Sequence, residues 1–157
     1  MVSILFVCHG NICRSPMAEF LMKDLVEKKK LSNLFHVESA ACHTDAIGCR
    51  PHRGTREKLQ EVGISTEGKV ARLIEKGDYE RFDYIVAMDK YNLYDLRYTF
   101  GGDREGKIKL LMEYAGVSRD VADPWYTGNF TDTFNDCKAG TEALLEYLVN
   151  KNQKLQK

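Results

Sequence analysis

The segment from Ser3 to Met22 reads SILFVCHGNICRSPMAEFLM and contains three local patterns in succession. Its first five residues, SILFV, form a continuous β-prone run, which is typical of a strand buried on both faces. A polar loop follows from Cys8 to Arg14. Ser15-Pro16 then indicates a helix start, with serine as the N-cap and proline at the first helical position. Because apolar residues recur at helical spacing after the proline, the segment predicts a strand, a tight loop and a helix.

The same alternation of strand and helix signals continues along the chain. Further buried strands are expected at Phe35–Ser39, Tyr84–Met88 and Ile108–Met112. Helices are expected at Thr55–Val62, which Gly63 closes, and near Asn92–Tyr98. A C-terminal amphipathic helix is marked by positions at helical spacing, namely Phe134, Cys137, Thr141, Leu144 and Leu148.

Strands that alternate with helices form right-handed βαβ units and a parallel sheet. We therefore expect an α/β fold, with a single-domain four-stranded parallel sheet and helices on both faces, doubly wound in the flavodoxin- or Rossmann-like manner. Ligands bind beyond the carboxyl ends of the strands in such sheets. The loop Cys8–Arg14 leaves the first strand at that edge, and the turn Ala87-Met88-Asp89 is expected there too.

The length and charge of the chain limit the classes of protein to which it can belong. Its 157 residues fit one domain, expected over residues 1–150, with a frayed C-terminal tail at 151–157. Lys plus Arg and Asp plus Glu number 23 each, so no net charge attracts nucleic acid or a membrane surface. The N-terminus lacks a basic region, and its apolar run of about six residues is too short for a signal peptide or a membrane span. We expect a cytoplasmic monomer.

Five cysteines are present, at positions 8, 13, 42, 49 and 137. An odd number without a secretion signal makes a disulfide framework an unfavourable interpretation. Four of them lie near His9, His43 and His52, so a zinc module is an alternative. Their Cys-x4-Cys and Cys-x6-Cys spacings differ from the usual two-residue zinc knuckle. We therefore expect neither a metal nor a cofactor.

The loop from Cys8 to Arg14 has the composition of an anion-binding nest. A loop that wraps into a helix N-terminus points several backbone N–H groups at one place, and the helix dipole adds positive potential there. Gly10 and Asn11 tolerate the positive φ that this wrap requires. Arg14 adds a planar fork for two phosphate oxygens. The same field favours the thiolate form of Cys8, facing a bound phosphoryl group.

Residues Val7 to Glu19, VCHGNICRSPMAE, resemble the phosphate-binding signature of the low-molecular-weight protein tyrosine phosphatases. The resemblance extends over nearly the whole chain through Ser39-Ala40-Ala41, Gly48, Leu59 with Gly63-Ile64, Phe82–Val86, Met88-Asp89 with Asn92-Leu93, and Asp123-Pro124-Trp125-Tyr126. It implies metal-independent hydrolysis of phosphotyrosine on proteins, and of small aryl phosphates, through a phosphocysteine intermediate. The expected partners are tyrosine-phosphorylated proteins.

The resemblance also implies a role for individual residues. Cys8 attacks phosphorus, Arg14 binds the equatorial oxygens, and Asp123 protonates the leaving phenolate and later activates water. Trp125 and Tyr126 contact the aryl ring of the substrate. The remaining residues expected to bind phosphate lie in the loop and at its end: His9, Gly10, Asn11, Ile12, Cys13 and Ser15.

Around this loop the resemblance implies supporting contacts. Asn11 is expected to adopt a left-handed conformation and to hydrogen-bond Ser15 and Ser39. Ser15 has two possible roles, as the helix cap and as a hydrogen-bond donor to the Cys8 thiolate. Asp89 is a further supporting candidate. Where family members often place a histidine in this network, this chain has Glu67-Gly68-Lys69, so that link is missing or replaced.

Two further features concern regulation and specificity. By resemblance, Cys13 forms a reversible disulfide with Cys8, which would protect the nucleophile from over-oxidation. Where many relatives have a tryptophan at the pocket rim, the stretch Thr44–Ile47 offers Asp45 or Ile47 instead. An acidic rim would favour basic residues beside the phosphotyrosine.

Two other reactions on the same fold are alternatives. Arsenate reductases need a relay of further cysteines, and none lies between Cys49 and Cys137. Arginine phosphatases of this family tend to have threonine at the position of Ile12, where an apolar β-branched residue resembles the tyrosine-specific members. A non-enzymatic phosphotyrosine binder is disfavoured because Cys8, Arg14 and Asp123 are all present.

Overall fold

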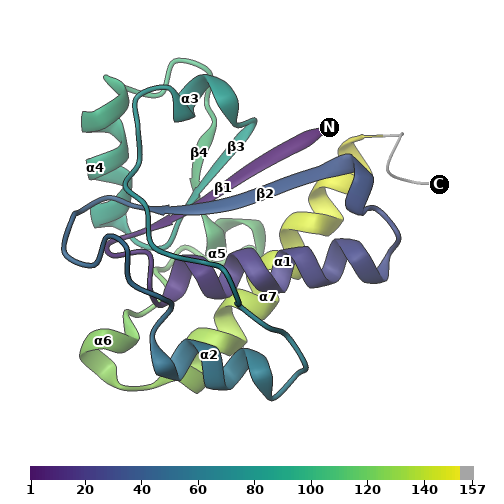
Figure 1. Ribbon diagram of the computed structural model, residues 1–157. Coiled ribbons are helices and arrows are strands. Elements are labelled where there is room, and N and C mark those ends of the chain that lie inside the picture. The colour runs from purple at the N-terminus through teal and green to yellow at the C-terminus, as the bar shows by residue number, and fades with distance from the viewer. Residues whose placement is uncertain (153–157) are drawn as a thin grey trace.

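A four-stranded parallel sheet lies at the centre of the computed structural model, which describes residues 1–152 (Figure 1). The strand order is β2-β1-β3-β4, with β1 (Val2–Cys8), β2 (Phe35–Ala41), β3 (Tyr84–Ala87) and β4 (Ile108–Leu110). β1 pairs in parallel with both β2 and β3, and its last residue, Cys8, lies opposite Ala41. This sheet confirms the expected α/β fold.

Helices cover both faces of the sheet (Figure 1). One face carries α1 (Arg14–Lys28), α2 (Arg53–Gln60), α5 (Leu111–Tyr114) and α7 (Phe130–Lys151), and the other carries α3 (Asp78–Arg81) and α4 (Lys90–Phe100). A one-turn helix, α6 (Pro124–Thr127), lies apart from the sheet, and a 3-10 turn at Ser32–Leu34 leads into β2. The parallel strands and two covered faces explain why SILFV is apolar without alternation.

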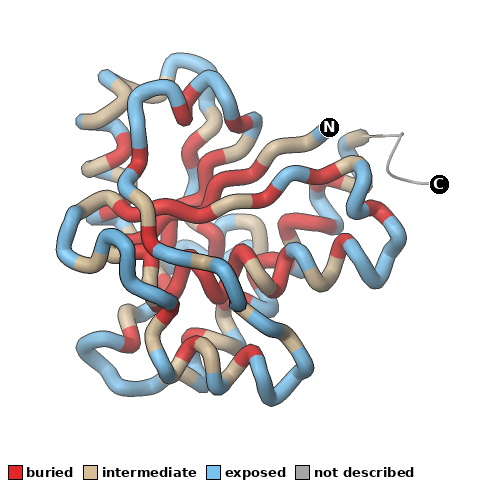
Figure 2. Tube along the Cα trace, in the orientation of Figure 1, coloured by how far each residue is buried: buried red, intermediate tan, exposed pale blue. Residues whose placement is uncertain are grey.

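The first strand is buried from Ile4 to Cys8 (Figure 2). Ile4 and Phe6 pack in a cluster with Met17 of α1 on one face. Leu5 and Val7 pack on the opposite face, in a cluster with Ile85. Because both faces of β1 are fixed by packing, the loop that leaves its carboxyl end starts from a rigid position.

Two glycines allow α7 to approach its neighbours closely. A Cβ atom placed on Gly140 would lie 2.4 Å from Leu111 Cγ of α5, and one placed on Gly54 of α2 would lie 2.5 Å from the Phe130 ring. Both distances are shorter than real carbon contacts, so larger side chains would push the helices apart. These contacts place α7 against α2 and α5, and α7 also packs against α1.

The helix start at Ser15-Pro16 was predicted incorrectly. α1 begins at Arg14 with Cys13 as its N-cap, and no side chain caps the helix. The Ser15 hydroxyl instead lies 3.0 Å from Cys8 Sγ. A serine before a proline is a common cap, but here the preceding strand brings a better partner to the hydroxyl.

Other element bounds differ modestly from the expectations. The fourth strand ends at Leu110, because Leu111 and Met112 begin α5. α2 begins earlier than predicted because His52 caps it, its Nδ1 accepting a hydrogen bond from the Gly54 amide at 3.0 Å. α7 begins at Phe130, capped by Asn129. The other bounds shift by a few residues without changing the order of the elements.

The tail expected at 151–157 falls mostly outside the described residues. Lys151 is the last residue of α7, and Asn152 follows it as the C-cap. Within the part of the chain that the structure describes, no helix is both long and apolar enough to cross a membrane.

Candidate active site

The loop from Cys8 to Arg14 is held at the carboxyl edge of the sheet by backbone bonds to the segments that follow β2. The His43 amide donates to the His9 carbonyl oxygen at 3.0 Å, and the His52 amide donates to Ile12 O at 2.7 Å. Asn11 has a φ of 59°, the left-handed conformation that the sequence predicted. These contacts give the loop its wrap around a central point.

Cys8 lies at the floor of this wrap and is only 2% exposed. The Ser15 hydroxyl lies 3.0 Å from its sulfur, and the Ser15 amide donates to the same sulfur at 3.4 Å. Inside the described part of the chain, the amide N–H groups of residues 10–13 have no hydrogen-bond acceptor. Unpaired amides that converge above a cysteine form a site for the oxygens of an anion.

Arg14 places a buried guanidinium beside Cys8 and Asp123. Its Nη1 donates to Asp89 Oδ2 at 2.6 Å and to Val121 O at 3.0 Å, and its Nη2 donates to Asp123 Oδ2 at 3.3 Å. A guanidinium has five N–H donors, so one on Nε and one on Nη2 remain. Nε is buried and has no partner within residues 1–152. The two remaining donors lie along one edge of the guanidinium, as a bidentate contact with two phosphate oxygens requires.

The charge of Arg14 is secured by its surroundings. Burial lowers the pKa of the guanidinium, but Cys8, Asp123 and Asp89 more than offset this, and the net pKa is raised. A buried cation is stable only beside such negative groups. Asp89, which caps α4, therefore has the supporting position that the sequence suggested for it.

Asn11 connects the loop to β2 by side-chain hydrogen bonds. Its Nδ2 donates to Ser15 Oγ at 2.7 Å and to Ser39 Oγ at 2.8 Å, and its Oδ1 accepts from the Arg72 amide at 3.2 Å. The expected bonds to both serines are thus present. All three side chains are fully buried, so water does not compete for their bonds.

Asp123 reaches the site from the loop before α6. Its backbone is extended, as the following proline predicts, and its Oδ1 caps α6 by accepting from the Trp125 amide at 3.0 Å. Its Oδ2 lies beside Arg14. The structure therefore brings Asp123 to the phosphate-binding loop, although the two segments lie far apart in the sequence.

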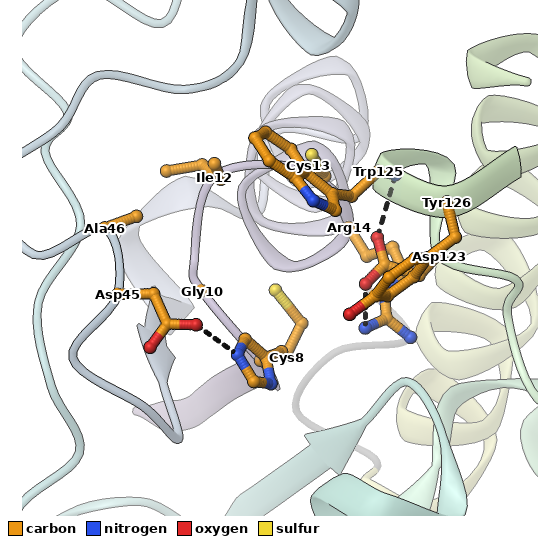
Figure 3. A pocket seen from close by; sticks show the side chains of 11 residues that line it. Cys8, Gly10, Ile12, Cys13, Arg14, Asp45, Ala46, Asp123, Trp125 and Tyr126 are labelled. Carbon is orange, nitrogen blue, oxygen red and sulfur yellow. Dashed lines mark hydrogen bonds and ion pairs between the residues drawn. The ribbon is translucent and has the colours of Figure 1, made fainter. Parts of the chain in front are cut away.

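A pocket of about 190 Å³ opens above the loop (Figure 3). Trp125 and Tyr126 form one wall, and Asp45 and Ala46 lie on the opposite side. Of the thirteen residues that the sequence singled out, nine line this pocket: Cys8, His9, Gly10, Ile12, Cys13, Arg14, Asp123, Trp125 and Tyr126. Ser15 contacts Cys8 from behind the lining. Asn11, Ser39 and Asp89 lie behind its lining.

Burial raises the pKa of three further cysteines, Cys13, Cys42 and Cys137. The pKa of Cys13 rises to about 12, with Cys8 and Asp123 adding to the effect of burial. Among the described residues no group of three or more His, Cys, Asp or Glu side chains could hold a metal ion, so the zinc alternative gains no support.

A family model described as low molecular weight phosphotyrosine protein phosphatase matches residues 3–156. The chain belongs to this family. The low molecular weight protein-tyrosine-phosphatase YfkJ of Bacillus subtilis is 44% identical over 98% of this chain and 99% of its own length. Its crystal structure has a TM-score of 0.94 and covers 97% of each chain.

Two further members extend the comparison. The low molecular weight protein-tyrosine-phosphatase PtpA of Staphylococcus epidermidis is 36% identical over 95% of both chains. The crystal structure of a Drosophila arginine phosphatase is 31% identical, with a TM-score of 0.84 over 92% of this chain and 96% of that one. Membership of the family makes this chain a phosphoric monoester hydrolase of the low-molecular-weight tyrosine phosphatase type.

Sequence reasoning missed two contacts at the rim. His9 Nε2 lies 2.8 Å from Asp45 Oδ2, and the His9 ring stacks on His43 with centroids 4.2 Å apart. His43 Nε2 in turn lies 2.8 Å from Asp95 of α4. The histidines each follow a strand, which was a signal that they share an edge of the sheet, but their stacking has no local pattern.

The link left open at residues 67–69 is filled by Lys69. Its Nζ donates to Ser39 O at 3.0 Å and lies 3.3 Å from Glu19 Oε1. Glu19 also accepts from the Ser39 hydroxyl at 2.5 Å. A polar side chain on an apolar helix face, as Glu19 is on α1, was the available signal for this buried partner.

Proposed function

We propose that this enzyme hydrolyses phosphotyrosine on proteins, and small aryl phosphates, through a phosphocysteine intermediate. Cys8 is the nucleophile, Arg14 binds the phosphoryl oxygens, and Asp123 is the general acid. The reaction uses neither a metal nor a cofactor, and the enzyme acts as a cytoplasmic monomer on tyrosine-phosphorylated proteins.

The buried Arg14 side chain is the observation that carries this proposal. Its Nε–H and one Nη2–H have no acceptor in the described chain, whereas its other donors are held by Asp89, Val121 and Asp123. Leaving a buried charged donor unpaired is costly, so this edge is suited to an anion that arrives with its own oxygens. The unpaired amides of residues 10–13 serve the same anion.

The proposed reaction has two steps. The Cys8 thiolate attacks phosphorus, the P–O bond to the aryl group breaks, and protonated Asp123 gives its proton to the leaving oxygen. A water molecule then attacks the phosphocysteine, the S–P bond breaks, and the Asp123 carboxylate takes the proton of that water. Phosphoryl transfer depends mainly on such positioning and on charge stabilisation.

The aryl preference is supported by the walls of the pocket. Trp125 and Tyr126 lie beside Asp123, where a leaving phenolate would stand (Figure 3). Aromatic side chains in this position stack on a phenyl ring. Ile12 lines the same pocket as an apolar side chain. Because the chain is also similar to a Drosophila arginine phosphatase, phosphoarginine is the alternative substrate.

The test is hydrolysis of p-nitrophenyl phosphate in excess EDTA by the wild type and by Cys8→Ser. We expect activity that survives EDTA and falls by more than about 10⁴-fold in the variant, because the hydroxyl is a far weaker nucleophile. The variant should still bind vanadate or phosphate in titration calorimetry. Phosphotyrosine and phosphoarginine peptides are then compared by kcat/KM. Retained activity in Cys8→Ser, or its loss in EDTA, would contradict the proposal.

We also propose reversible oxidation of Cys8, with Cys13 as the resolving thiol. Peroxide oxidises the Cys8 thiolate to a sulfenic acid, and the Cys13 thiol displaces water from it to give a disulfide. Both cysteines line the pocket, although the raised pKa of Cys13 keeps it in the thiol form. After mild peroxide, dithiothreitol should restore most activity of the wild type and much less of Cys13→Ser. Equal recovery would count against this step.

A further inference from the structure

A lysine and a glutamate form an ion pair behind the phosphate-binding loop, away from the pocket. The Glu19 side chain is 4% exposed and that of Lys69 is 12% exposed, with 3.3 Å between Nζ and Oε1. Charged side chains are seldom buried to this degree unless each serves the other. Neither lines the pocket in which the reaction is proposed.

The hydrogen bonds between this pair and Cys8 have a defined direction. The Arg72 amide can only donate, so it fixes Oδ1 of Asn11 as the acceptor and Nδ2 as the donor. Nδ2 then donates one hydrogen to Ser15 Oγ and the other to Ser39 Oγ. Each serine oxygen therefore accepts one hydrogen bond, and its own hydroxyl hydrogen remains to be donated to another group.

The two serines therefore donate in opposite directions. The Ser15 hydroxyl donates toward Cys8 Sγ at 3.0 Å, where it favours negative charge on the sulfur. The Ser39 hydroxyl donates to Glu19 Oε1 at 2.5 Å. Glu19 is the acceptor in this second bond.

We propose that Lys69 is a positioning residue for Cys8, which it reaches through Glu19, Ser39, Asn11 and Ser15. Its ammonium contacts Glu19 Oε1 and so holds that oxygen where it accepts from the Ser39 hydroxyl, which keeps Ser39 donating away from Asn11. Asn11 is then free to donate to both serines, and Ser15 directs its hydrogen to the sulfur. Without Lys69, Glu19 Oε1 and the Ser39 carbonyl oxygen lose the partner that they share, and the Ser39 hydroxyl is no longer held toward Glu19.

Lys69 holds Ser39 at two points. Its Nζ donates to the Ser39 carbonyl oxygen at 3.0 Å and contacts the same Glu19 oxygen that accepts from the Ser39 hydroxyl. Lys23 also binds Glu19, but at the other oxygen, Oε2, at 2.6 Å, and its side chain is 45% exposed. Lys23 is therefore a matched control that carries the same charge without contact to Ser39.

The charged groups that face Lys69 shift its pKa in opposite directions. Burial lowers its pKa, Glu19 opposes this, and the cations Arg72 and Lys23 lower it further. The ammonium of Lys69 thus depends on Glu19. Replacing either partner should therefore change the same set of hydrogen bonds.

The experiment compares Lys69→Met, Lys69→Arg and Lys23→Met. The readout is the rate at which iodoacetamide alkylates Cys8 across a range of pH, followed on the Cys8 peptide by mass spectrometry because Cys49 is exposed and also reacts. In Lys69→Met we expect the midpoint of this profile to move upward by about one pH unit. kcat should fall roughly tenfold with KM little changed. Lys69→Arg should restore most of both values, and Lys23→Met should leave them near wild type.

A double-mutant cycle tests the route. If Lys69 acts through Ser39, then Lys69→Met should add little further change in a Ser39→Ala background. Additive effects, or a midpoint in Lys69→Met that moves no more than in Lys23→Met, would overturn the inference. A Lys69→Gln variant, compared at equal thermal stability, repeats the test if Lys69→Met folds poorly.

This inference rests on the proposed function, but its failure can be recognised separately. Alkylation of Cys8 measures the sulfur without a phosphatase assay. Suppose that Cys8→Ser abolishes hydrolysis while the Lys69 variants leave the alkylation profile unchanged. The assignment of Cys8 as the nucleophile is then retained, and only the proposed role of Lys69 is rejected.

Discussion

The floor and the rim of the pocket are built in opposite ways. On the floor, Cys8, Asn11, Arg14 and Ser15 are at most 2% exposed, and their side chains are joined to one another or to the surrounding elements by hydrogen bonds. On the rim, Trp125 is 62% exposed and Tyr126 is 83% exposed. Figure 3 shows the two regions facing one space.

This difference separates two tasks. Buried polar groups with fixed partners hold the geometry that a reaction needs, because any shift would leave a partner unpaired. Exposed side chains have few such partners, so they can be exchanged at little cost to the fold. We therefore expect changes in the floor to affect kcat strongly and changes at the rim to affect KM modestly.

The largest effect in this comparison is expected from Asp123→Asn. Asparagine retains an oxygen that can cap α6 but cannot supply the proton, so kcat should fall roughly 10²- to 10⁴-fold. The loss should be greatest for aryl phosphates with poor leaving groups. Steady-state kinetics across a series of substituted phenyl phosphates measures this, and an equal loss for all leaving groups would remove Asp123 from the role of acid.

A smaller effect is expected from Trp125→Ala at the rim. Loss of a stacking wall should raise KM for phenyl phosphates by roughly three- to tenfold, with kcat nearly unchanged. Tyr94→Ala, which removes another exposed aromatic side chain on α4, is the control and should change neither value. A fall in kcat as large as that of Asp123→Asn would erase the distinction between floor and rim.

The smallest effect is expected from Asp45→Asn. A hydrogen bond from His9 holds the pKa of Asp45 below its usual value, so the rim carries a carboxylate throughout the neutral range. Removing this exposed charge should lower kcat/KM about two- to fivefold for phosphotyrosine peptides with a neighbouring lysine or arginine. Peptides with neutral neighbours should not respond. Glu142→Gln, a distant exposed substitution, serves as the control, and an equal response of both peptide classes would argue against recognition by Asp45.

The floor was easier to predict from the sequence than the rim. Cys8, Asn11, Arg14 and Ser15 lie within eight positions, and a strand followed by a helix fixes their arrangement locally. Of the two roles expected for Ser15, the contact with the Cys8 sulfur is present and the helix cap is not. Residue type alone did not distinguish these two uses of a hydroxyl.

The parts that escaped prediction depend on distant segments. The contact of His9 with Asp45 and the burial of Lys69 beside Glu19 join residues with no shared periodicity. The early start of α7 was also missed, although Phe130 lies one helical turn before Phe134 and packs on the same core cluster. The short helices α3 and α6 carry too few residues for a periodic signal.

The partners of Arg14 have a consequence for the order of folding. Its hydrogen bonds to Asp89, Val121 and Asp123 join positions 75, 107 and 109 residues apart. Contacts of such long range form late, after the intervening loops have closed. A nascent chain that already exposes the Cys8 loop therefore lacks the finished site until α4 and the segment before α6 have docked. Any oxyanion that binds only the finished site draws the folding equilibrium toward completion by mass action.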